Sequence, residues 1–326
     1  MLNIKEILTK NPIVAAPLAG ISNAAYRSLC LQFHAGLVYT EMVSAEAMHY
    51  RNPRTFSMTK ISAEEHPLAM QIFGYRPASM VEAACYLDQH TCCDIIDINM
   101  GCPAPKVTKT GAGSALMHTP QLAYEIVKAV TEKVQKPVSV KIRLGYSESE
   151  KNYLSFAQAM EAAGASLLAI HGRTRTQMYE GQADWQAIKE VKEALTIPVI
   201  GNGDVRTVDD FLQRKKESGV DAIMIGRGLI GNPFLIREID AALRGENPAD
   251  IPTTERIWAC KEHAQRLIKL HGEALAMRQM RGLAANYLKG LPHSASLRGR
   301  CNQVVTYEDL ENLLNEYQEI IVKEIK

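Results

Sequence analysis

The stretch from Asp94 to Val107 reads "DIIDINMGCPAPKV": it starts as an apolar β-strand and ends in a loop with a glycine, a cysteine and prolines. Apolar runs of this kind are typical of strands that are buried on both faces of a parallel sheet. The strand ends on Asn99-Met100-Gly101-Cys102, which places a thiol at the start of the loop. This stretch therefore predicts a buried parallel strand whose carboxyl end carries a candidate reactive group.

Seven other short apolar runs occur before and after this strand, and helical patterns separate most of them. The eight expected strands cover residues 13–19, 37–42, 68–74, 95–101, 138–144, 167–173, 198–204 and 221–227. Strands that alternate with helices indicate a parallel sheet, and eight repeats in about 230 residues are typical of an α/β TIM barrel, a (β/α)8 fold. On the pattern alone, a doubly wound sheet is the competing fold. The polar residues that end nearly every strand favour the barrel, because its strand ends converge on one mouth.

A polar segment, "RGENPADIPTTER", follows the barrel pattern and reads as a linker. Beyond it the periodicity is helical, so we expect a barrel domain over 1–245 and a small all-helical domain over 252–326. Between residues 256 and 300, nine Lys and Arg outnumber two acids, which gives a local charge of +7 in a chain of net charge +1. A basic segment of this kind suits a nucleic-acid backbone, and a solvated helix face is the alternative.

The composition, 46% hydrophobic and 22% charged, is typical of a soluble globular protein. We find no apolar run of the roughly 18 residues that a membrane helix needs, and no signal peptide at the N-terminus. The seven cysteines include no pair of C-x-x-C motifs, so a structural zinc site is not expected. We therefore expect a cytoplasmic, monomeric protein without a metal or a membrane partner.

Two adjacent strand ends are rich in glycine: "GNGD" at 201–204 and "GRG" at 226–228. A glycine-rich strand end that opens a helix presents backbone N–H groups to an anion, and phosphate sites after strands 7 and 8 are common in barrels. Arg227 adds a cation. Glycines that only make tight turns are the alternative, but two neighbouring strand ends together favour a phosphate.

Lys141 lies within an apolar strand, and a lysine that points into a barrel needs an anion or a polar ligand. The amides of Gln71 and Asn99 suit a flat heterocycle with mixed donors and acceptors, whereas His171 alone reads as a structural histidine. With a phosphate site, this set suits flavin mononucleotide (FMN). Cys102 could then act as a proton donor, with freedom of movement from "GAG" at Gly111–Gly113, although without a flavin it reads as a buried loop cysteine.

Eight motifs in order resemble the tRNA-dihydrouridine synthase family. They are "APLAGISNAAYR", "EMVSAEA", "MQIFG", "DINMGCPAPKVTKTGAGSAL", "VSVKIRLG", "IHGRTRTQMYEGQADW", "IPVIGNGDV" and "IMIGRGLIGNPF". The whole pattern looks most like the bacterial B-type branch. The tail departs from that branch at Gly282-Leu283 and at Asn286, which leaves the choice of target uridine open.

The resemblance implies an FMN enzyme in which NADPH (or NADH) reduces the flavin, hydride passes to carbon 6 of a tRNA uridine, and Cys102 protonates carbon 5. The residues that it implies for the cofactor are Pro17, Leu18, Ala19, Gln71, Lys141, His171, Asn202, Gly203, Asp204, Gly226 and Arg227. Those for tRNA are Asn99 and Arg173 at the uracil, with Arg278, Arg281 and Lys289 expected in the basic tail.

Two rival functions remain on the sequence. A flavin barrel that acts on a free pyrimidine, such as a dihydroorotate dehydrogenase, would have no reason for a basic helical tail. A non-catalytic RNA-binding protein would have no need of Cys102, Lys141 and the phosphate loop.

Overall fold

A computed structural model describes residues 3–62 and 64–324 of the chain, with side chains through residue 321. The described residues form two compact units that divide between Gly226 and Arg227. The division comes before the expected boundary at 245–252, because α11 (Phe234–Leu243) groups with the helices that follow it. A functional boundary after residue 245 stays a prediction.

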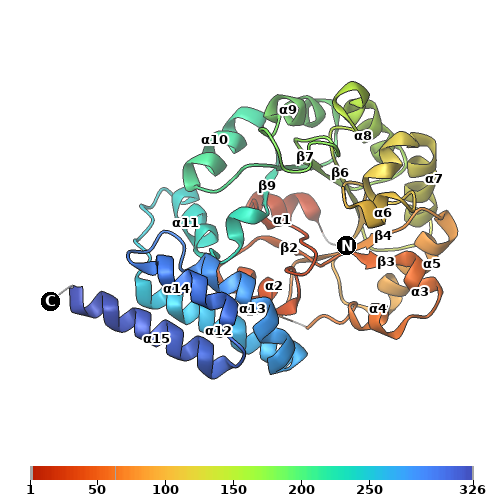
Figure 1. The fold of residues 1–326 in the computed structure, drawn as a ribbon. Helices are drawn as coiled ribbons and strands as arrows, with labels where there is room; N and C mark the ends of the chain where they lie inside the picture. Colours follow the sequence, from red (N-terminus) through yellow and green to blue (C-terminus); the bar gives the residue numbers. More distant parts are fainter. Residues whose placement is uncertain (1–2, 63, 325–326) are drawn as a thin grey trace. The chain divides into compact units, whose positions relative to one another are not determined.

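The first unit is a closed barrel of eight parallel strands (Figure 1). These are β1 (Ile13–Ala15), β2 (Leu37–Tyr39), β4 (Leu68–Phe73), β5 (Ile95–Asn99), β6 (Val138–Ile142), β7 (Leu167–His171), β8 (Val199–Asn202) and β9 (Ala222–Ile225). β1 pairs with both β2 and β9, and β2 pairs with β4, which closes the ring. The short β3 (Val43–Ser44) pairs with the end of β4. All eight expected strands are present, so the TIM barrel is confirmed and the doubly wound sheet is wrong.

Helices surround the barrel (Figure 1). In the first unit they are α2 (Ala24–Gln32), α3 (Ala45–His49), α4 (Pro53–Ser57), α5 (Pro77–His90), α6 (Pro105–Thr108), α7 (Pro120–Thr131), α8 (Tyr153–Ala162), α9 (Trp185–Ala194) and α10 (Val208–Ser218), whereas α1 (Ile4–Lys10) packs into the end of the barrel. Local sequence fixes their ends: α10 begins with a capping box between Thr207 and Asp210 and ends at Gly219, which has a φ of 67°. On α9, Trp185, Ile188 and Val191 form the buried stripe.

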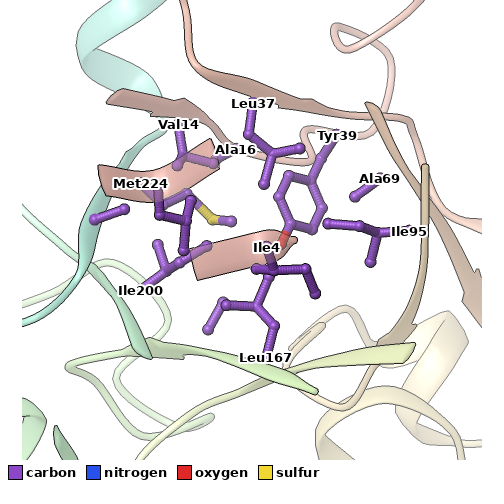
Figure 2. Packing of buried hydrophobic residues seen from close by; sticks show 13 residues of the cluster. Ile4, Val14, Ala16, Leu37, Tyr39, Ala69, Ile95, Leu167, Ile200 and Met224 are labelled. Atoms are coloured by element: carbon purple, nitrogen blue, oxygen red, sulfur yellow. The ribbon is translucent and has the colours of Figure 1, made fainter. Parts of the chain in front are cut away.

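An apolar cluster fills the end of the barrel where the strands begin (Figure 2). Val14, Leu37, Ile95 and Leu167 contribute to it from four strands, and Ile4 of α1 lies among them. Because side chains alternate between the two faces of a strand, residues two and four positions further along each strand also point inward. We call this cluster the apolar floor of the barrel. The next inward-pointing residues along each strand lie nearer the other end of the barrel, the mouth.

The second unit is helical. Besides α11 it contains α12 (Thr253–His271), α13 (Glu273–Tyr287), α14 (Ser294–Arg300) and α15 (Tyr307–Glu324). Its core is formed by side chains such as Leu267, Met280 and Leu314, and His263 Nδ1 lies 3.0 Å from the hydroxyl of Tyr287 within it. The expected helical tail is confirmed. Among the residues that the structure describes, we find no helix with the length and apolar character needed to cross a membrane.

Candidate active site

Directly above the apolar floor, the barrel contains a buried layer of polar side chains. Gln71, Asp97 and Ser139 are register partners on β4, β5 and β6. Gln71 Nε2 donates to Asp97 Oδ2 at 2.7 Å, and Ser139 Oγ donates to Asp97 Oδ1 at 2.5 Å. Asp97 is 0% exposed, and burial raises the pKa of its carboxyl group to about 6. Each oxygen of this carboxylate therefore has a hydrogen-bond donor.

The next layer connects this carboxylate to the loop that carries Cys102. Asn99 Nδ2 donates to Gln71 Oε1 at 2.7 Å. Asn99 Oδ1 accepts the backbone N–H of Cys102 at 2.8 Å and that of Gly101 at 3.1 Å. Asn99 therefore holds the start of the loop, with its amide oriented by Gln71.

The backbone around Cys102 is fixed from the other side as well. The carbonyl oxygen of Cys102 accepts from Ser114 N at 3.1 Å and from Ser114 Oγ at 2.9 Å. Gly113 has a φ of 62°, and a Cβ there would lie 2.9 Å from the Cys102 carbonyl oxygen. Ala112 is buried and Gly113 is needed for this close contact, so both pack tightly here, and the expected freedom of "GAG" stays a prediction. The Cys102 side chain is partly exposed, while its backbone N–H and carbonyl are both hydrogen-bonded.

Two cations, on β6 and just after its carboxyl end, lie near this thiol. Lys141 and Arg143 both interact electrostatically with Cys102, whereas Lys106 and Lys109, which follow Cys102 in the sequence, are exposed. Lys141 Nζ donates to Asn202 Oδ1 at 3.3 Å, and Asn202 Nδ2 donates to the carbonyl of Met224 at 2.7 Å. Burial lowers the pKa of Lys141 to about 8. The mouth therefore combines a thiol with a lysine that stays mostly protonated at neutral pH but loses its proton more readily than a lysine in water.

Arg143 is a residue that the sequence analysis missed. It is buried, and its Nε donates to the carbonyl of Gly101 at 2.8 Å. Its Nη1 donates to the carbonyls of Thr174 and Met178 at 2.8 and 3.0 Å. Arg143 thus ties the Cys102 loop to the loop after β7. The available signal was its position two residues after Lys141, on the same face of the strand.

Arg173 and Asp204 form an ion pair with each other, although the sequence predicted Arg173 at the uracil and Asp204 at the cofactor. Arg173 is 1% exposed, and its Nη2 donates to Asp204 Oδ2 at 2.6 Å and to the Gly181 carbonyl at 2.6 Å. Asp204 Oδ2 also accepts the backbone N–H of Ala183 at 2.8 Å. The pair therefore shapes the loop after β7, and its contacts to uracil or phosphate stay predictions.

Hydrogen bonds to the side chains of Ser22 and Glu41 hold the backbone of the loop after β1 in place. Ser22 Oγ accepts the N–H of Leu18 at 2.9 Å, and Gly20 N donates to Glu41 Oε1 at 2.5 Å. Pro17 and Leu18 are partly exposed, and Ala19 is exposed. These three expected cofactor residues therefore form an accessible rim whose backbone is anchored.

The remaining expected phosphate residues lie at the ends of β8 and β9. Gly203 has a φ of 143°, and a Cβ there would lie 2.4 Å from the Cβ of Ala183 and 3.4 Å from the buried His171 ring, so glycine is required. Gly226 is partly exposed, and a Cβ there would meet nothing nearer than 3.7 Å. Arg227 is exposed and is the first residue of the second unit.

Comparison with known proteins now adds to this geometry. The family model described as dihydrouridine synthase matches residues 13–325. The chain belongs to the dihydrouridine synthase family. A probable tRNA-dihydrouridine synthase of Mycobacterium tuberculosis is 39% identical over 96% of this chain and 84% of its own length. The tRNA-dihydrouridine synthase B of Shewanella oneidensis is 38% identical over 96% of this chain and 97% of its own length.

Solved structures share the fold of this dihydrouridine synthase family member at low sequence identity. A histamine dehydrogenase from Rhizobium superposes with a TM-score of 0.56 at 14% identity, over 81% of this chain and 51% of that one. The structure titled TcOYE with pHBA gives a TM-score of 0.53 at 13% identity, over 75% of this chain and 92% of that one. These likenesses support the barrel fold.

The helical unit shows where the expected tRNA contacts of this family member lie. Arg278 and Lys289 are exposed, so both are accessible to a polyanion. Arg281 is half-buried, and its Nε donates to the carbonyl of Val304 at 2.8 Å. Asn286, one of the departures from the B-type pattern, donates from Nδ2 to the Gly282 carbonyl at 2.8 Å. Arg278 Nε also donates to a backbone carbonyl, that of Ala274 at 3.2 Å, so exposure rather than the lack of a partner makes Arg278 and Lys289 the clearer candidates for phosphate contacts.

Proposed function

We propose that this protein reduces uridines in tRNA to 5,6-dihydrouridine, with FMN as hydride carrier, NADPH or NADH as reductant and Cys102 as the general acid. Membership of the family supports tRNA uridine reduction by a flavin enzyme. The observation that carries the proposal is the mouth of the barrel, where Cys102 has a fixed backbone and lies within the electrostatic reach of Lys141 and Arg143.

The residues present fit a flavin. Gln71 uses one amide hydrogen on Asp97, which leaves the other hydrogen for a ligand. Lys141, His171 and Asn202 lie on the neighbouring strands β6, β7 and β8, and two of the three are partly exposed. The glycines at 203 and 226 and the cation of Arg227 suit the ribityl phosphate. FMN bound in this way supplies the hydride.

Lys141 then orients the polar edge of the ring system and, as an ammonium ion, stabilises negative charge there. We assign Asn99 to the uracil, together with Arg173. A proton must reach carbon 5 on the face opposite the flavin. Cys102 holds that proton on Sγ, and its backbone is kept in place during the transfer by the hydrogen bond that its N–H donates to Asn99 and by the one that its carbonyl accepts from Ser114.

The helical domain is assigned to the tRNA backbone. Exposed cations such as Arg278 and Lys289 can neutralise phosphates, which supplies affinity without base specificity. The target base must also leave its stack to reach a barrel mouth. A free pyrimidine would use neither feature, which is why we favour tRNA over the rival substrate.

The test uses the purified protein. Acid-released cofactor should run as FMN on chromatography, and release of FAD, or no flavin after reconstitution, would contradict the assignment. Under anaerobic conditions NADPH should bleach the flavin, and unmodified tRNA should reoxidise it with formation of dihydrouridine detected by mass spectrometry. Free uridine and orotate are the controls: reoxidation by either at the rate seen with tRNA would favour the pyrimidine-reducing rival.

A further inference from the structure

Asp97 is a buried carboxylate for which the chemistry above has no use. It lies in the layer directly above the apolar floor, 0% exposed, between Gln71 and Ser139. Burial of a carboxylate in a barrel is unfavourable unless its oxygens are paired. Asp97 meets that requirement, and its partner Gln71 is the first link to the reactive loop.

A chain of hydrogen bonds links Asp97 to Cys102 through the side-chain amides of Gln71 and Asn99. In this chain each donor points toward Asp97. An ionised carboxylate only accepts, so the Nε2 end of Gln71 must face Asp97 and the Oε1 end must face Asn99. Asn99 then turns Nδ2 toward Gln71 and Oδ1 toward the N–H groups of Gly101 and Cys102. The acceptor at position 97 therefore determines the orientation of both amides.

The reverse orientation of the chain is unfavourable. With Gln71 rotated, its NH2 group would face Asn99, which would have to present its oxygen there and its own NH2 to the loop. Two backbone N–H groups would then meet a donor, and each unsatisfied buried group is costly. Without an acceptor at position 97, Gln71 Nε2 would lose its partner, and only the two loop N–H groups would hold the orientation of the amides.

The carboxylate is ionised at neutral pH. Burial raises its pKa to about 6, while the hydrogen bonds from Ser139 and Gln71 and the charge of Lys141 favour the ionised form. Tyr39, which also interacts electrostatically with Asp97, is neutral at this pH because burial and that charge raise its pKa. No charged group apart from Lys141 contributes to the shift of Asp97 among the described residues.

We propose that Asp97 is a positioning residue that fixes the amide orientations of Gln71 and Asn99, and through them the backbone of Cys102. This inference rests on the proposed function for its catalytic consequence, since Cys102 is the proposed acid and Asn99 the proposed uracil contact. Its structural part, the protection of the loop N–H groups, does not depend on activity.

The test measures hydrogen exchange at the N–H groups of Gly101 and Cys102 in the flavin-loaded protein, resolved by fragmentation of the peptide that contains them. Asp97→Leu removes the acceptor at similar volume, and exchange at these two groups should rise about 10-fold, the equivalent of one hydrogen bond. Asp97→Asn keeps an acceptor for Gln71 and should stay within about 3-fold of the wild type.

Ser139→Ala is the matched control, because it removes the other donor to Asp97 and leaves the chain to Cys102 complete. It should also stay within about 3-fold of the wild type. Unchanged exchange in Asp97→Leu would overturn the proposal, as would an equal rise in the peptides of β8, since that would indicate general loosening. If Asp97→Leu does not fold, Gln71→Met interrupts the same chain, and unchanged exchange at Gly101 and Cys102 in that variant would overturn the proposal as well.

Reoxidation of the reduced flavin by tRNA is measured on the same samples. The rate should fall about 10-fold in Asp97→Leu and stay close to the wild-type rate in Asp97→Asn. If the wild type does not reduce tRNA at all, the proposed function fails, while the exchange result still decides whether Asp97 orients the loop.

Discussion

The two units of this protein differ in where their functional polar side chains lie: buried in the barrel, and on the surface of the helical unit. In the barrel, Gln71, Asp97, Asn99 and Arg143 are buried and hydrogen-bonded across strands. In the helical unit, the buried side chains are mostly apolar, and the cations proposed for phosphate contacts lie on the surface. In a closed ring of parallel strands, neighbouring strands supply hydrogen-bond partners to polar side chains in the interior. A small helical core supplies few such partners.

This difference has an energetic consequence. Charges inside the barrel interact through a medium of low polarity, so they can shift pKa values and orient ligands. Charges on the helical unit interact through water and ions, and their effect weakens with salt. We therefore expect changes in the barrel to alter chemistry strongly and changes in the helical unit to alter affinity modestly.

The largest expected effect belongs to the thiol. Cys102→Ala should retain FMN and be reduced by NADPH at the wild-type rate, because the thiol has no part in that half-reaction. Reoxidation by tRNA should slow by about 10²–10⁴-fold, the usual contribution of general acid catalysis. Anaerobic stopped-flow absorbance measures both steps. Cys92→Ala, at an exposed cysteine before β5, is the control, and a wild-type rate in Cys102→Ala would reduce Cys102 to a loop residue.

The same substitution should have opposite signs in the two units. Gly113→Ala should destabilise the protein by about 2 kcal/mol or more, because φ is positive and the new Cβ would press on the Cys102 carbonyl oxygen. Gly282→Ala, inside α13 with no atom within 4 Å of the new Cβ, should stabilise it by up to about 1 kcal/mol. Chemical unfolding measures both. Equal effects would show that the close packing at Gly113 imposes no constraint.

Two buried ionisable groups, Asp97 in the barrel and His263 in the helical unit, should change the stability in opposite directions as the pH falls. Asp97 has a folded pKa of about 6, above its ordinary value, so its contribution to stability grows as the pH falls through 6. His263 has a pKa lowered to about 4 by burial, so the folded state resists its protonation and loses stability as the pH falls below 6.5.

From pH 7 to pH 5, the wild type should gain about 1 kcal/mol relative to Asp97→Asn and lose about 2 kcal/mol relative to His263→Gln. Urea unfolding at the two pH values gives each difference. A change of the same sign for both variants would contradict the opposite pKa shifts.

The smallest effect is expected from the exposed cations. Arg278→Gln and Lys289→Gln should each weaken tRNA binding a few-fold and lower the slope of log K against log salt by about 0.7–0.9. Lys216→Gln, an exposed lysine near the end of α10 in the barrel unit, should leave the slope unchanged. A slope unaltered by the first two changes would mean that the basic face is only solvated.

The sequence allowed the barrel to be predicted because each strand is a separate apolar run, and the topology then brings the strand ends together. Gln71, Asn99 and Cys102 could be named for the same reason, and the structure joins them by hydrogen bonds. The role of Arg143 could not be read from its own segment, because it depends on carbonyls of the loop after β7. Likewise, the pairing of Arg173 with Asp204 exists only once β7 and β8 are neighbours.

The helix α1 has a further consequence. With Ile4 packed into the floor, apolar side chains fill the end of the barrel where the strands begin, and the mouth at the other end is the opening that the proposed site faces (Figure 2). Under the proposed function, nicotinamide and uracil would both have to approach the flavin through this opening, because the opposite end is filled. The reductant would then have to leave before the tRNA base arrives, and the two substrates would take turns. Under the proposed function, the filled end of the barrel would thus impose an order on the two half-reactions.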